Sequence, residues 1–215
     1  MTCLQNYLDN NQKKSTSAIA YLAALDHLKE TCRPVYSSII QELTDQRSQL
    51  KLIASENYSS LAVQLAMGNL LTDKYSEGIP DRRFYAGCEN VDAIESYAIE
   101  KAKKIFNADH AYVQPHSGAD ANMVALFAIL THRVQDEELQ KMGKTIDQLS
   151  TEEYEALRKQ FMGQKLMGMS LASGGHLTHG YRHNVSSKIM HSVCYDVDAK
   201  TGLLDYKQLA DQVKQ

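Results

Sequence analysis

The sequence predicts an α/β fold in which parallel strands alternate with helices. Three short apolar runs in the second half of the chain are typical of buried strands: AYVQP (111–115), LMGMS (166–170) and IMHSVCY (189–195). Helical patterns follow or separate them at 91–106, 116–130 and 205–215. Strands that alternate with helices usually pair in parallel, so the prediction is an α/β sheet.

The first half of the chain reads as helical. Residues 1–16 are polar and irregular, which predicts a loose arm, and helical periodicity begins at Ser17. Pro34 suits the first position of a second helix, and 61–71 has the pattern of a third. Residues 73–90 fit neither a helix nor a strand. We therefore expect a helical amino-terminal arm over 1–60 and a partial large domain over 61–215.

The composition limits the classes of function. The 215 residues have a formal net charge of −3, which gives no basic surface for nucleic acid or an anionic membrane. No apolar run is long enough to span a bilayer, and the first residues lack the apolar core of a secretory signal. Four scattered cysteines without CxxC spacing suit reduced thiols. These features predict a cytoplasmic protein.

A candidate anion site lies at HSGA. Ser117, Gly118 and Ala119 follow a predicted strand and begin a helix. Unpaired amides at a helix start bind phosphate, and glycine allows close approach. An ordinary strand-to-helix turn is the alternative.

The segment GGHLTHGYRH is a candidate for stacking on a flat cofactor. His176 follows Gly174 and Gly175 just after a strand, where ligands bind in open α/β sheets. A metal site is a rival interpretation, because His176, His179 and His183 have H-x2-H-x3-H spacing. No cysteine or carboxylate is clustered there, so we expect no metal.

Two further clusters have possible chemical roles. Tyr75, Glu77 and Tyr85 share one loop with two arginines, and such residues can tune a proton donor or line a slot for a flat substrate. A salt-bridged surface turn is the alternative. Ser55 follows an apolar pair, where it or Asn57 is also a candidate helix cap.

Five blocks in order, LIASENY, DKYSEG, RRFYAGCENVDAIE, VQPHSGADAN and SGGHLTHG, resemble the signature blocks of serine hydroxymethyltransferases. The resemblance implies fold type I of the pyridoxal-phosphate enzymes, the aspartate-aminotransferase-like fold, with an incomplete large domain. It implies transfer of the serine hydroxymethyl group to tetrahydrofolate, which gives glycine and methylenetetrahydrofolate. It also implies pyridoxal 5'-phosphate as cofactor and a homodimer whose subunits share the active site.

The resemblance assigns roles residue by residue. The cofactor-binding positions are Ser117, Gly118 and Ala119 at the phosphate, His176 stacked on the pyridine ring, and Tyr75 reaching the phosphate from the partner subunit. The catalytic positions are Glu77, Tyr85 and His176, with Glu77 handling the proton of the substrate hydroxyl. The substrate-binding positions are Ser55 near the substrate carboxylate, Glu77, and the folate-site residues Tyr85, Leu171, Gly174, Gly175 and Leu177.

Three departures from the family pattern qualify this resemblance. Phe84 stands where many members have tyrosine, and residues 132–162 look like a surface insertion with a helix capped by Ser150 and Glu153. The chain also stops before the family's Schiff-base lysine, so we expect the fragment alone to be inactive. A non-catalytic binding or dimer-interaction module derived from this fold remains an alternative. A different pyridoxal-phosphate enzyme would not share the loop that carries Tyr75 and Glu77.

Overall fold

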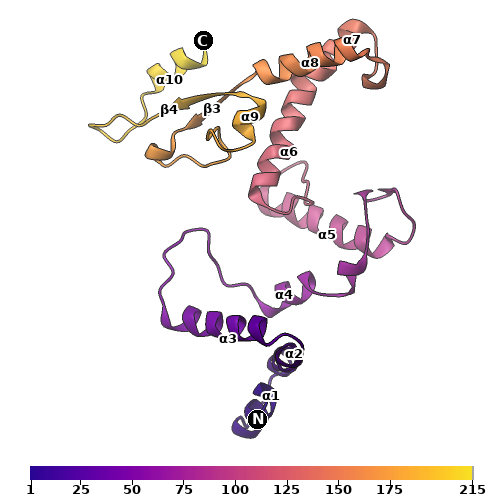
Figure 1. The fold of residues 1–215 in the computed structure, drawn as a ribbon, viewed down its shortest axis with the longest axis vertical. Helices are drawn as coiled ribbons and strands as arrows, with labels where there is room; N and C mark the ends of the chain where they lie inside the picture. The colour runs from indigo at the N-terminus through magenta and orange to yellow at the C-terminus, as the bar shows by residue number, and fades with distance from the viewer. Residues whose placement is uncertain (215) are drawn as a thin grey trace. The chain divides into compact units, whose positions relative to one another are not determined.

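The computed structural model describes residues 1–214, which form two compact units, Met1–Tyr97 and Ala98–Gln215. The elements of the first unit are α1 (Cys3–Asn10), α2 (Thr16–Thr31), α3 (Arg33–Ser48), α4 (Leu61–Met67), η1 (Leu70–Asp73), β1 (Gly78–Ile79), β2 (Arg82–Arg83) and the first half of α5 (Glu89–Phe106) (Figure 1). The two units divide after Tyr97, whereas the sequence predicts a domain boundary after residue 60. Compact units need not be domains, so the domain boundary stays a prediction.

The amino-terminal arm is more ordered than the sequence predicts, because α1 lies within residues 1–16. Thr2 caps this helix by accepting a hydrogen bond from the Gln5 amide at 3.1 Å. The Asp26 carboxylate of α2 accepts from the amides of Cys3 and Leu4 at 2.7 and 2.9 Å. Burial by itself would raise the pKa of Asp26, but these two amides, the Thr2 side chain and the charge of Lys29 together lower the pKa. The helix start is thus satisfied from another helix, which local sequence does not reveal.

The predicted helices at 17–30, 35–49 and 61–71 are confirmed as α2, α3 and α4 with η1. Pro34 occupies the second rather than the first position of α3, since the helix begins at Arg33. The cap of α4 is Ser60, whose side chain accepts from the Val63 amide, and not Ser55 or Asn57. The segment 73–90 is also more regular than predicted, because β1 and β2 form a short antiparallel hairpin.

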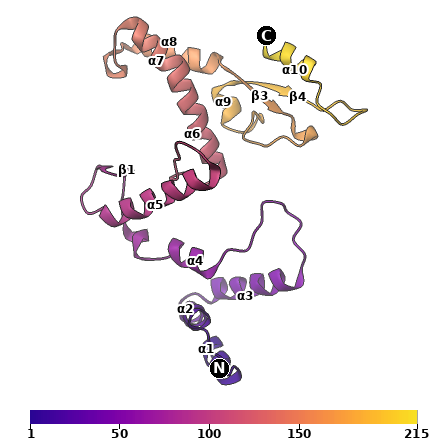
Figure 2. The ribbon, with the colours of Figure 1, turned by 180° about the vertical axis from the view of Figure 1, so that it is seen from behind.

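The second unit continues α5 and contains α6 (Gly118–Leu130), η2 (Thr131–Gln135), α7 (Asp136–Met142), η3 (Ile146–Gln148), α8 (Thr151–Gly163), β3 (Lys165–Met169), η4 (Leu171–Ser173), α9 (Ser186–Ile189), β4 (His191–Tyr195) and α10 (Tyr206–Val213). β3 and β4 pair in parallel, from Lys165 opposite His191 to Met169 opposite Tyr195. Two of the predicted strands and their parallel pairing are therefore confirmed. Figures 1 and 2 show α9 beside these strands.

The prediction of a strand at 111–115 is wrong for this structure. The segment has no regular secondary structure, and it joins neither two-stranded sheet of the described residues. A strand is defined by its ladder of hydrogen bonds to a neighbour, and apolar composition alone does not supply that neighbour.

The core of the second unit includes the stretch 132–162, although the sequence predicts a surface excursion there. Leu130 and Met190 are buried together with Val134 and Leu157, which belong to this stretch. Leu126, Leu149, Phe161, Leu166 and Ile189 pack around them. η2 is a π-helical turn that joins α6 to α7. The predicted cap of α8 by Ser150 and Glu153 is confirmed as a capping box.

Candidate active site

The start of α6 presents backbone amides to solvent. Ser117 is the N-cap, and its hydroxyl accepts from the Asp120 amide at 3.1 Å. Within residues 1–214 no acceptor contacts the amides of Gly118 and Ala119. Both residues are exposed, and a Cβ built on Gly118 meets no atom within 4 Å. Open amides at the positive end of a helix dipole are suited to a phosphate group.

The loop that carries His176 lies directly on β3 because two glycines allow it. A Cβ on Gly175 would lie 1.8 Å from the Met169 carbonyl oxygen, and one on Gly168 would lie 2.1 Å from that of His179. Gly174 ends η4 with a φ of 94°, in the left-handed region. No larger residue fits these approaches, so the glycines hold the loop against the strand.

His176 is tied to α6 through Thr178. The Thr178 amide donates to His176 Nδ1 at 3.2 Å, and the Thr178 hydroxyl lies 2.8 Å from the same nitrogen. The Asn122 side-chain amide donates to the Thr178 hydroxyl oxygen at 2.6 Å. Asn122 stands four residues after Gly118, about one helical turn. These contacts therefore link the exposed imidazole to the helix whose first turn holds the open amides.

A cavity of about 460 Å³ lies beside this loop in the second unit. Its wall is formed by the end of β3, the histidine loop and β4, with Met169, Ser170, Leu171, His176, His179, Gly180, Tyr181, Arg182, Ser187, Met190, His191, Ser192 and Cys194. Its volume falls in the usual range for small-molecule sites. Of the predicted folate-site residues, Leu171 lines this cavity, while Leu177 is nearly half exposed in the same loop.

The carboxyl ends of β3 and β4 are joined by Asp196. Its carboxylate accepts hydrogen bonds from the hydroxyls of Ser170 and of Ser173, the latter at 2.8 Å. These two hydroxyls lower the pKa of Asp196. The Ser173 hydroxyl oxygen also accepts from the Val197 amide at 3.2 Å. The sequence analysis missed this cluster, since the two serines lie 23 or more residues before Asp196 and Val197 in the chain.

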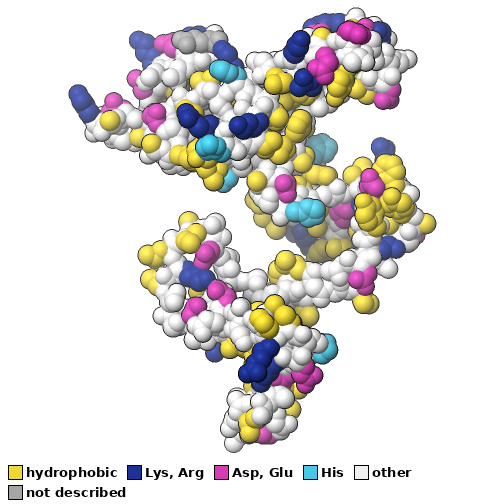
Figure 3. All heavy atoms as spheres, in the orientation of Figure 1, with side chains coloured by type: hydrophobic (Ala, Val, Ile, Leu, Met, Phe, Trp, Pro, Cys, Tyr) yellow, Lys and Arg dark blue, Asp and Glu magenta, His cyan; other side chains and the backbone are white. Residues whose placement is uncertain are grey.

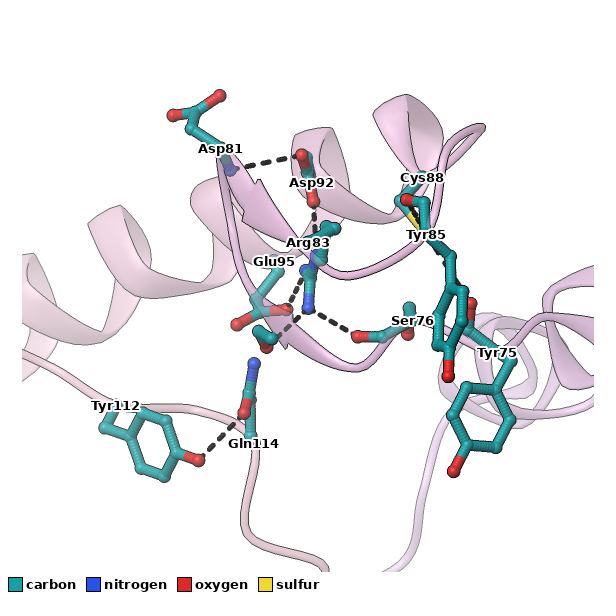
Figure 4. A network of polar contacts seen from close by, with 11 residues as sticks. Tyr75, Ser76, Asp81, Arg83, Tyr85, Cys88, Asp92, Glu95, Tyr112 and Gln114 are labelled. Atoms are coloured by element: carbon teal, nitrogen blue, oxygen red, sulfur yellow. Dashed lines mark hydrogen bonds and ion pairs between the residues drawn. The ribbon is translucent and has the colours of Figure 1, made fainter. Parts of the chain in front are cut away.

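In the first unit, the hairpin brings Tyr75, Glu77 and Tyr85 together in one loop. The Tyr75 and Tyr85 rings form an edge-to-face pair with centroids 5.5 Å apart (Figure 4). The Phe84 amide donates to the Glu77 backbone carbonyl oxygen, and this bond fixes the backbone of the residue that carries the carboxylate. Glu77 is exposed, and the Tyr75 and Phe84 side chains are 72% and 76% exposed. Hydrophobic side chains are widely visible on the surface in Figure 3.

Arg83 organises this hairpin from its interior. Its guanidinium donates to the carbonyl oxygens of Ser76 and Gly78, at 2.7 and 2.8 Å, on either side of Glu77. It also pairs with Asp92 at 2.7 Å and Glu95 at 2.5 Å on α5 (Figure 4). The hydrogen bond from Arg83 lowers the pKa of Asp92. The salt-bridged turn, which was the alternative interpretation, is therefore present. It holds the loop backbone and leaves the Tyr75 and Glu77 side chains exposed.

Ser55 occupies a different part of the first unit. It lines a hollow of about 460 Å³ against α3 with Glu42, Gln46, Lys51, Glu56, Asn57 and Tyr58. Lys51 lies 2.9 Å from Glu42 and 3.6 Å from Glu56, so ion pairs line this hollow. None of its lining residues belongs to the hairpin. The structure thus groups the predicted residues into three sets, at the hairpin, at Ser55, and at α6 with the His176 loop.

The residues missed by sequence analysis at the third set are Asn122 and Thr178. One signal was present, because Asn122 lies one helical turn from Gly118 and so shares a face with the helix start. Their pairing was not predictable, as 56 residues separate them in the chain.

Residues 1–214 contain neither a metal-binding cluster nor a helix that could span a membrane. No group of three or more His, Cys, Asp or Glu side chains could hold a metal ion. The His176 and His179 rings are 5.6 Å apart, whereas His183 packs on Tyr181. No helix in this range is long and apolar enough to cross a membrane.

Comparison with known proteins gives one family. The family model described as serine hydroxymethyltransferase matches residues 28–153 and 143–215. The chain is 54% identical over 214 residues to the serine hydroxymethyltransferase of Chlamydia trachomatis serovar D, with 99% of this chain and 43% of that protein covered. It is 57% identical over 197 residues to that of Treponema pallidum, with 91% and 34% covered. The chain therefore spans less than half the length of these relatives.

The comparisons also bear on the stretch 132–162. The two matched segments of the family model overlap at residues 143–153, inside that stretch. The Chlamydia trachomatis relative aligns over nearly the whole chain. Whether the stretch is an insertion relative to other members stays a prediction.

Proposed function

This chain belongs to the serine hydroxymethyltransferase family, a family of fold type I pyridoxal-phosphate enzymes, and we propose that it forms the amino-terminal part of such an enzyme. The proposed reaction transfers the hydroxymethyl group of serine to tetrahydrofolate and gives glycine and methylenetetrahydrofolate. The observation that carries this proposal is the hydrogen-bonded link from the start of α6 through Asn122 and Thr178 to His176. It joins a phosphate-binding feature to an exposed flat ring.

The residues present fit pyridoxal phosphate. The amides of Gly118 and Ala119, with the Ser117 cap, would hold the phosphate, and glycine leaves room for it. The His176 imidazole would lie against the pyridine ring. When bound, the cofactor withdraws electrons from the serine α-carbon and so weakens the bond to the hydroxymethyl group. The amide at position 119, and not a side-chain hydroxyl, would make the phosphate contact, because this chain has Ala119.

The hairpin would supply groups for substrate and proton handling. Glu77 is exposed on a backbone fixed by Arg83 on both sides, which suits a carboxylate that must meet a substrate hydroxyl. Tyr75 would reach the cofactor phosphate, and Tyr85 would contact folate together with Leu171, Gly174, Gly175 and Leu177. Ser55 would lie near the substrate carboxylate. Phe84 would lack one polar contact with folate that a tyrosine at this position would offer.

We further propose that the enzyme is a cytoplasmic homodimer in which each subunit lends its hairpin to the other. Two exposed aromatic rings and Phe84 on a rigid, internally braced loop are suited to insertion into a partner. A symmetric dimer makes the exchange reciprocal. Within this proposal, residues 1–60 are the helical arm and 61–215 part of the large domain, and the 215-residue fragment alone is inactive because the cofactor-anchoring lysine lies in the remainder of the longer enzyme.

The test uses the full-length protein and two inactive variants, Glu77→Gln and a substitution of the cofactor-anchoring lysine. The parent should cleave serine in the presence of tetrahydrofolate, and each variant alone should lose about 10²- to 10⁴-fold in rate or more. If the hairpin acts across subunits, mixing the variants creates dimers with one intact site, and activity returns. If the parent does not turn over serine, the reaction is wrong. If mixing restores nothing, the shared site is wrong.

A further inference from the structure

We propose that Thr178 and Asn122 are positioning residues that fix the orientation of the His176 imidazole, with Nδ1 held as a hydrogen-bond acceptor. The inference rests on the proposed function only for the identity of the ligand, a pyridine ring that lies against His176. The orientation itself follows from contacts within the second unit.

The direction of the hydrogen bonds is set by chemistry. A side-chain NH₂ group of asparagine only donates, so the Thr178 hydroxyl oxygen accepts from Asn122 at 2.6 Å. The hydroxyl hydrogen is then available for His176 Nδ1 at 2.8 Å. The Thr178 backbone amide, which only donates, approaches the same nitrogen at 3.2 Å. Two donors thus converge on Nδ1, which places the imidazole proton on Nε2.

The arrangement restrains a ring that would otherwise rotate. The terminal torsion of histidine is broad, so an exposed imidazole adopts a fixed plane only if its nitrogens are held. Thr178 is only 5% exposed, whereas His176 is exposed. The buried hydroxyl therefore holds the exposed ring. Asn122 lies on α6, about one turn from Gly118. The same helix therefore fixes both the plane of the His176 ring and the position of the proposed phosphate-binding amides.

A purely structural role is the competing explanation, in which Asn122 and Thr178 only fasten the loop to α6. The two explanations differ in whether the variants act through His176. Thr178→Val keeps the shape and the backbone amide but removes the hydroxyl, while Thr178→Ser retains it. Thr151→Val is a matched control, since Thr151 is an exposed threonine of the same unit on α8.

The first measurement needs no cofactor. Histidines of the full-length protein are labelled with ¹⁵N, and the His176 signals are assigned by their loss in His176→Gln. We expect Nδ1 of the parent to be unprotonated, Thr178→Val and Asn122→Ala to shift its resonance and raise the population of the Nδ1–H tautomer, and Thr178→Ser to resemble the parent. His176 signals that are the same in Thr178→Val and in the Thr151→Val control would overturn the inference.

The second measurement is a double-mutant cycle for pyridoxal phosphate affinity. Binding is monitored by the visible absorption and circular dichroism of the bound cofactor. Thr178→Val should weaken binding about 5- to 30-fold, in line with the loss of one hydrogen bond to a positioned group. In the His176→Ala background the same change should have no further effect. Additive losses would overturn the inference. A parent protein that does not bind pyridoxal phosphate would refute the proposed function, whereas the ¹⁵N signals would still decide whether the ring is positioned.

Discussion

Replacing Leu157 by alanine should lower the free energy of unfolding by about 2.5 to 3.5 kcal/mol. Leu157 lies on α8, within the stretch 132–162, and its side chain is only 3% exposed. The substitution removes three buried carbons, each worth about 0.8 kcal/mol, which gives roughly 2.4 kcal/mol of lost transfer energy. A cavity penalty adds to this, but the side chain also borders an open groove of about 430 Å³. Collapse or hydration of the site should therefore keep the total in the lower half of the usual range for this substitution.

The assay is urea unfolding of the chain, followed by far-ultraviolet circular dichroism, with the slope of free energy against urea held common to all variants. Lys159→Ala is the matched control, because Lys159 is exposed on the same helix and should change stability by less than about 0.5 kcal/mol. Equal stability of the two variants would show that 132–162 does not contribute to the core. The absence of any cooperative transition in the parent would refute the premise that this stretch and the β3–β4 sheet unfold together.

Three further outcomes are expected. Gly175→Ala should destabilise the second unit by about 1 to 3 kcal/mol in thermal unfolding, because its Cβ would lie 1.8 Å from the Met169 carbonyl oxygen; an unchanged transition would mean that the loop moves freely off β3. The lowered pKa of Asp196 contributes stability above the ordinary pKa of an aspartate, and that contribution is lost as the pH falls through the lower pKa of the folded state. Ser173→Ala should raise the pKa of Asp196 in an NMR titration, and an unmoved titration would contradict the role of that hydroxyl. Borohydride reduction of the 215-residue chain with pyridoxal phosphate should give no single stoichiometric lysine adduct, as judged by peptide mass spectrometry, and one such adduct would show that a lysine of this chain anchors the cofactor.

The features predicted correctly from the sequence are those that depend on neighbouring residues. The helix start at Ser117 and Gly118 and the capping box of Ser150 and Glu153 are determined within one helical turn, and both are present. The parallel pair β3 and β4 was also predictable, because each strand has its own apolar run and the segment between them is long enough for a crossover.

The features that were missed depend on partners distant in the chain. The helix α1 begins where it does because Asp26 accepts from its first amides, which no local pattern in residues 1–16 indicates. Val134 lies in the core with Leu157 and Met190, which are 23 and 56 residues further along the chain, whereas its polar neighbours had suggested a surface segment. The Asn122–Thr178 contact spans 56 residues and needed the fold to become visible.

The hairpin shows how one cluster separates rigidity from recognition. Four hydrogen bonds converge on the Arg83 guanidinium, whose side chain is only 5% exposed, and they involve two carbonyl oxygens of the loop and two carboxylates of α5. A planar guanidinium can serve all four acceptors at once, which lysine cannot do. Arg83 therefore holds the loop backbone, and the side chains of Tyr75, Glu77 and Phe84 remain exposed, although the Tyr75 ring also contacts that of Tyr85. In the proposed dimer this loop would keep its shape when its exposed side chains meet the partner subunit, so association would have little ordering cost.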